Sequence, residues 1–97
     1  ALMYAQKMQK RAARKGAFAQ TAEDAAAALK AAECGWEEAV PENAAERAGA
    51  LLFAAANAMR LAGVDAEEAL TFASGRFRQE LLQKTEDSDG QERPATV

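Results

Sequence analysis

The sequence predicts an all-α protein, and three observations carry that prediction. Alanine, the residue with the highest helix propensity, occurs 27 times among the 97 residues. Isoleucine is absent, and the other β-branched and aromatic residues that favour strands are scarce. Only two prolines and six glycines interrupt the chain, and apolar residues recur between them at helical spacing. We therefore expect a four-helix, bundle-like domain without strands.

The first expected helix covers residues 1–15, with Gly16 at the position of its C-cap. Phe18 lies in the connection that follows and is expected to pack back onto the bundle. The apolar residues that share one side of this helix, and that we expect to be buried, are Leu2, Met3, Met8 and Ala12.

The second expected helix begins after Thr21, which has the character of an N-cap because acidic residues follow it in the first turn. It extends to about Ala39. Its apolar stripe consists of Ala25, Leu29, Ala32, Trp36 and Val40. Glycine inside a helix costs about 1 kcal/mol relative to alanine, so Gly35 indicates that another helix or a ligand approaches closely there. Trp36 either stacks on a base or, as a lone aromatic on an apolar stripe, packs in the core.

The third and fourth expected helices follow a turn over residues 40–43, where Pro41 disfavours helical backbone at Val40. The third extends to Ala62 and carries a stripe of Leu51, Leu52, Ala55, Met59 and Ala62. The fourth covers residues 66–84 after a start at Asp65, and its stripe consists of Leu70, Ala73, Phe77 and Leu81. The polar, acidic residues 85–97 are expected to form a disordered tail, so the domain covers residues 1–84.

Large apolar side chains are few, because alanine supplies over half of the apolar fraction of 49%. Burial of a leucine or phenylalanine side chain stabilises a fold by roughly 1.5–3 kcal/mol, and burial of a methyl group by far less. A single copy of this chain would therefore be marginally stable. We expect an obligate homodimer or higher homo-oligomer, in which the helices bury a second face against another subunit.

Composition also excludes several classes of function. A net charge of −3 argues against a general nucleic-acid binder. With Cys34 as the single cysteine and no histidine, an intramolecular disulfide is excluded, and neither a zinc site nor a histidine-activated thiol is expected. No signal peptide or membrane-spanning run is visible, so we expect a cytoplasmic protein without membrane contact. The chain begins with Ala1 inside a helical pattern, which is typical of a fragment of a longer protein or of a chain whose disordered ends are missing.

Two groups of charged residues are candidates for chemistry. Glu33 and Glu37 lie one helical turn apart, and Lys30 lies on the same side, so the two carboxylates either hold Mg²⁺ or form a solvated face. Glu46, after the turn, is a candidate for a third ligand. The first helix is strongly basic, and Lys7, Lys10 and Arg11 either contact phosphates or are ordinary surface charges.

The residues also resemble a known family. The segments that carry the resemblance are 7–16 (KMQKRAARKG), 30–37 (KAAECGWE), 49–60 (GALLFAAANAMR), 63–70 (GVDAEEAL) and Arg76–Phe77. Over residues 5 to 82 the chain resembles the MazG nucleoside triphosphate pyrophosphohydrolases of the all-α NTP pyrophosphatase superfamily. The resemblance implies a helical oligomer that uses Mg²⁺ to cleave a nucleoside triphosphate into NMP and pyrophosphate. It also implies that Glu33 and Glu37 bind metal and that Lys10, Lys30, Asn57 and Arg76 bind substrate.

The chain departs from this family where the metal should bind. In the family signature K-x-x-E-E-x-x-E, Lys30, Glu33 and Glu37 match, but Cys34 replaces the second Glu; a second register, with Glu33 in that position, remains open. The E-x-x-D of the next helix reads Arg47 to Ala50, so both acids are missing. Loss of carboxylates lowers Mg²⁺ affinity and water activation together.

Two functions therefore follow from the resemblance. The first is an Mg²⁺-dependent pyrophosphohydrolase domain with reduced or lost activity. The alternative is a non-catalytic domain of the same fold, which binds nucleotide or serves for oligomerisation. Asn57 leaves a similar alternative open, because it either contacts a nucleotide or is a buried amide bonded to a neighbouring helix.

Overall fold

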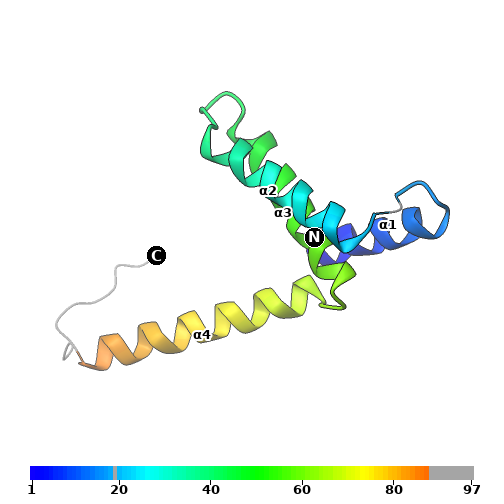
Figure 1. Ribbon diagram of the computed structural model, residues 1–97. Helices are drawn as coiled ribbons and strands as arrows, with labels where there is room; N and C mark the ends of the chain where they lie inside the picture. The colour runs from blue at the N-terminus through cyan, green and yellow to red at the C-terminus, as the bar shows by residue number, and fades with distance from the viewer. Residues whose placement is uncertain (19, 88–97) are drawn as a thin grey trace. The chain divides into compact units, whose positions relative to one another are not determined.

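The computed structural model describes residues 1–18 and 20–87, and among these residues it contains four α-helices and no strand (Figure 1). The helices are α1 (Leu2–Arg14), α2 (Ala22–Glu37), α3 (Ala44–Leu61) and α4 (Ala66–Asp87). The all-α prediction is confirmed. Residues 85–87, which we expected in the tail, are helical, and residues 88–97 lie outside the described part of the chain. None of the described helices is both long and apolar enough to cross a membrane.

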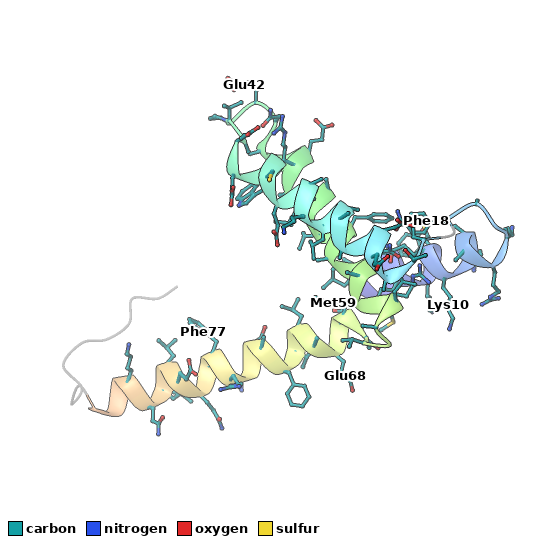
Figure 2. All side chains as sticks on the ribbon, in the orientation of Figure 1. Lys10, Phe18, Glu42, Met59, Glu68 and Phe77 are labelled. Carbon is teal, nitrogen blue, oxygen red and sulfur yellow. The ribbon has the colours of Figure 1, made fainter. Side chains whose placement is uncertain are left out.

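The chain divides into two units, residues 1–67 and 68–97. In the first unit α2 and α3 pack along each other, and α1 packs against α3 (Figure 1). The described part of the second unit is the portion of α4 that begins at Glu68. In Figure 2 the labelled side chains of Glu68 and Phe77 extend from this helix.

The ends of the helices follow the local signals in the sequence. Thr21 is the N-cap of α2: its hydroxyl accepts from the Asp24 backbone N–H at 3.0 Å, and the Asp24 carboxylate accepts from the Thr21 backbone N–H at 3.3 Å. Gly16 and Gly63 follow α1 and α3 with φ of +79° and +80°, in the left-handed region that glycine tolerates best. α2 ends at Glu37, two residues before the expected end at Ala39.

Replacing Thr21 with alanine is expected to lower the free energy of unfolding by about 1 kcal/mol, because the substitution leaves the Asp24 backbone N–H without its cap. Denaturant unfolding monitored by circular dichroism measures the change. The control is Ser74→Ala, which removes a hydroxyl from an exposed position inside α4. Equal stability of the Thr21 variant and the native chain would contradict the role of the capping box.

The buried side of α1 differs from the prediction. Gln9 is its most buried side chain, with 1% of its surface exposed, whereas Met3 and Met8 are 47% and 41% exposed. The reason is that the Gln9 amide donates from Nε2 to the Phe53 carbonyl of α3 at 3.0 Å, which turns this side of α1 toward α3. Leu2 and Ala12 are half-buried beside it.

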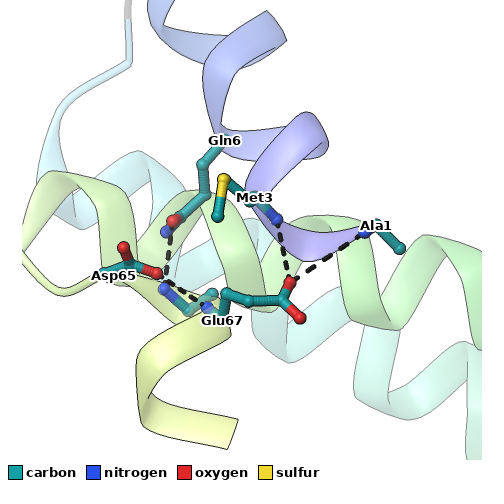
Figure 3. Close-up of polar contacts among 6 residues, drawn as sticks. Ala1, Met3, Gln6, Asp65 and Glu67 are labelled. Atoms are coloured by element: carbon teal, nitrogen blue, oxygen red, sulfur yellow. Dashed lines mark hydrogen bonds and ion pairs between the residues drawn. The ribbon is translucent and has the colours of Figure 1, made fainter. Parts of the chain in front are cut away.

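A second glutamine joins α1 to the end of α3 and the start of α4. Gln6 Nε2 donates to the carbonyls of Ala56 at 2.9 Å and Val64 at 3.1 Å, and its Oε1 accepts from the Ala66 backbone N–H at 3.0 Å. Figure 3 shows this junction, where the Glu67 carboxylate also accepts from the Met3 backbone N–H at 3.2 Å. The Asp65 carboxylate accepts from the Glu67 backbone N–H at 2.9 Å and so caps α4 at the residue that we expected to start it.

The apolar core of the described residues is small. Its fully buried apolar side chains are three alanines, Ala25, Ala56 and Ala66. Phe18 packs against the Phe53 ring with 6.3 Å between the ring centroids, as expected. A core of this size cannot supply much stability from apolar burial within one copy.

Most of the predicted apolar stripes are exposed. Leu52 is 56% exposed on α3 and Trp36 is 45% exposed on α2, although Ala25 of the α2 stripe is buried as expected. Met59 and Val40 are also exposed, and so are Leu70, Phe77 and Leu81 of the α4 stripe. For the α2 and α3 residues of the first unit, the prediction that they form the core within one chain is wrong: α3 meets α1 through the backbone of Phe53 and Ala56 instead.

Candidate functional site

Lys30, Glu33 and Glu37 lie exposed on α2, where their spacing placed them. Lys30 and Glu33 line one open hollow together with Leu29 and with Ala58 of α3. Glu37 is not part of its lining. The structure thus brings together one expected metal ligand and one expected substrate residue, beside apolar side chains of both helices.

Arg47 stands in the first part of α3, at the position where the resemblance predicts the first acid of E-x-x-D. Its guanidinium donates from Nη1 to the Gly35 carbonyl of α2 at 2.7 Å. A Cβ atom added to Gly35 would lie 3.5 Å from Arg47 Cδ. The expected close approach at Gly35 is therefore present, and the approaching group is the Arg47 side chain, which bonds to a residue midway in the sequence between Glu33 and Glu37.

The described residues do not fit a magnesium site. In residues 1–18 and 20–87 no group of three or more Asp, Glu, Cys or His side chains is close enough to hold a metal ion. Ala50 offers no ligand, and Arg47 brings positive charge to the part of α2 that carries the two glutamates. Mg²⁺ requires oxygen ligands and is repelled by a neighbouring guanidinium.

Asn57 is 3% exposed, and its amide bonds in two directions. Its Nδ2 donates to Gln20 Oε1 at 2.7 Å, and its Oδ1 accepts from Arg60 Nε and Nη2 at 3.1 and 2.8 Å. Both polar groups of the amide are therefore engaged by this chain, which favours the buried-amide interpretation over nucleotide contact.

Lys10 and Arg76 lie in different parts of the chain. Lys10 is exposed on α1 and lines a hollow with Lys7 and Arg60. Arg76 is exposed on α4, within the second unit, and lines a surface depression of that helix with Phe72. The other substrate residues implied by the resemblance, Lys30 and Asn57, belong to the first unit.

Sequence reasoning missed three residues that shape the first unit, Gln6, Gln9 and Arg60. Gln6 and Gln9 stand three apart in a basic helix and look like surface residues, so no local signal distinguishes them. For Arg60 a signal was present, because it stands one turn after Asn57, where an arginine can reach the buried amide.

Comparison with protein-family models, with curated proteins and with solved structures finds no match to the chain.

Proposed function

We propose that this chain is a self-associating helical domain of MazG-type ancestry that no longer hydrolyses nucleoside triphosphates. The resemblance supports the ancestry, and the structure of the first unit supports the loss of chemistry. Of the two non-catalytic alternatives, nucleotide binding and oligomerisation, the exposed apolar surface favours oligomerisation.

The position of Arg47 is the observation that carries the loss of hydrolysis. Its bond to the Gly35 carbonyl is short, at 2.7 Å, and fixes a positive charge against α2. A pyrophosphohydrolase of this kind needs several carboxylates there to hold the metal that activates water. The candidate ligands present are Glu33 and Glu37 on α2 and Glu46 in the first turn of α3, and among the described residues no three acids lie close enough together to hold a metal.

A partly exposed apolar stripe along α3 and its C-cap supports self-association. Ala48, Leu52, Ala55, Met59 and Ala62 are separated by alternating steps of four and three residues, which is the spacing of a helix seam that packs against another helix. Leu52 and Met59 of this seam are exposed. A second copy is the partner that is always available, and it would cover the same stripe on both chains.

An assay of pyrophosphate release from mixed NTPs with Mg²⁺ tests the loss of hydrolysis. We expect no release by the native chain above a metal-free control. The triple variant Cys34→Glu, Arg47→Glu, Ala50→Asp restores the family's acids and is expected to release pyrophosphate at least about tenfold above that control. Its helical content is checked by circular dichroism before the assay.

The two arms of this assay separate the two parts of the proposal. Turnover by the native chain would overturn the loss of hydrolysis. A folded triple variant without turnover would count against MazG-type ancestry, because the family's ligand set should then be sufficient to bind the metal.

A further inference from the structure

Helix α4 carries an apolar face that its expected stripe does not include. The surface depression of this helix has a volume of about 590 Å³, and the apolar part of its lining consists of Phe72, Gly75 and Leu82. Phe72 and Leu82 are 72% and 59% exposed. Beyond the helix backbone and the chain neighbours of Gly75, no described atom lies within 4 Å of the position of a Cβ atom there, so the backbone of α4 can be approached closely.

The residues along this depression have the spacing of a seam that packs against another helix, with alternating steps of four and three residues. The members of this α4 seam are Glu68, Phe72, Gly75, Gln79 and Leu82. The expected stripe lies on the other side of the helix, and the side chains of Glu68 and Phe77 extend from opposite sides of α4 in Figure 2, because nine residues make about two and a half turns. A partner on one side of α4 therefore leaves the other side uncovered.

The positions that flank the α4 seam carry positive charge and no acid. They are the e and g positions of the heptad, Ala69, Thr71, Arg76, Arg78 and Gln83. Arg76 and Arg78 are exposed, and both line the depression. Charges at these positions select the partner of a helix, because they lie beside the flanking positions of the facing helix. The α4 seam therefore favours a partner that brings carboxylates to its flanks.

We propose that the α4 seam binds an amphipathic helix of another protein, which has apolar residues in its own seam and acidic residues on its flanks. Phe72 and Leu82 pack against the apolar residues of the partner, and the missing side chain at Gly75 makes room for a large one. Arg76 and Arg78 pair with the carboxylates. A second copy of α4 is a poorer partner, because it brings the same two arginines and no acid to the flanks. The α4 seam is separate from the α3 seam, so the proposal does not depend on self-association.

Fluorescence anisotropy with two labelled synthetic peptides tests this proposal on the full chain. Both peptides are helices of about three heptads with leucine in the seam, and the flanks carry glutamate in one and lysine in the other. The native chain is expected to bind the glutamate peptide at least about tenfold more tightly than the lysine peptide. The double variant Phe72→Ser, Leu82→Ser is expected to weaken binding of the glutamate peptide at least about tenfold. The matched control, Phe77→Ser, Leu81→Ser, makes the same chemical change at exposed positions on the other side of α4, and we expect it to change binding less than about twofold.

The variant Arg76→Gln, Arg78→Gln separates recognition of charge from burial of apolar surface. It is expected to reduce the preference for the glutamate peptide to less than about threefold, and circular dichroism checks the helical content of every variant. The proposal is overturned if the glutamate peptide does not bind, if the lysine peptide binds as tightly, if the preference survives the loss of both arginines, or if the two serine variants weaken binding equally. It is also overturned if Phe72→Ser, Leu82→Ser makes the chain alone sediment as a smaller species, because a second copy would then occupy the α4 seam.

Discussion

Replacing Leu52 and Met59 with glutamate is expected to abolish the proposed self-association, raising the dissociation constant of the assembly at least about a hundredfold. Both side chains are exposed on the α3 seam, at 56% and 37%. Burial of each against a second copy is worth roughly 1.5–3 kcal/mol, and every copy in the assembly loses both contributions. The substitutions also place four carboxylates in the seam of a dimer, where like charges repel.

Analytical ultracentrifugation over a range of protein concentrations measures the effect. The control is Gln79→Glu, Gln83→Glu, which adds the same charge at the same type of exposed helical position in α4 without removing apolar surface. We expect this control to associate like the native chain. If the native chain sediments as a monomer, and its unfolding midpoint does not depend on concentration, self-association through this seam is wrong.

The features that could be predicted from the sequence are those that depend on neighbouring residues, such as the ends of helices. Thr21 and Gly63 marked helix ends correctly, because a cap is decided by a few neighbouring residues and the backbone conformation that they adopt. Gly35 was also interpretable, since a glycine inside a helix indicates a close neighbour. The identity of that neighbour, Arg47, depends on the register of α2 against α3 and could be recognised only in the structure.

The side of each helix that is covered within the chain could not be predicted in the same way. An apolar stripe indicates that a helix face packs against another element, but not whether that element belongs to this chain or to another copy. The spacing of the α3 stripe predicted a buried face, yet Leu52 and Met59 are exposed within the chain. On α1 the covered residue is Gln9, because its partner, the Phe53 carbonyl, is 44 residues away and no local pattern could reveal it.

In the candidate site, too, positions within one helix could be predicted from the sequence, but contacts between distant segments could not. Lys30 and Glu33 line one hollow because both belong to one face of α2, as their spacing required. Asn57 could be singled out as an isolated polar residue in an apolar run, but its partner Gln20 lies 37 residues away in another segment. Contacts of this range depend on helix packing, which side-chain volume and hydrogen bonding decide together.

Replacing Gln6 with leucine is expected to lower the free energy of unfolding by about 3–5 kcal/mol, a large fraction of the stability of so small a domain. The substitution removes three hydrogen bonds and leaves the backbone N–H of Ala66 without its acceptor. Ala66 is 3% exposed, so water has little access to replace the lost acceptor. An unsatisfied buried donor costs about 1–3 kcal/mol, and each remaining bond contributes about 1 kcal/mol.

The same substitution at Gln9 provides the matched control, because it makes an identical chemical change on the same helix. Gln9 makes one hydrogen bond, and its buried Oε1 has no partner among the described residues. Leucine of similar size removes that unsatisfied oxygen, while the Phe53 carbonyl keeps its place in the hydrogen-bond ladder of α3. We therefore expect Gln9→Leu to change the unfolding free energy by less than about 1 kcal/mol. Denaturant unfolding of both variants at one fixed concentration makes the comparison, and equal losses would mean that burial of α1, rather than the bonds of Gln6, holds the junction together.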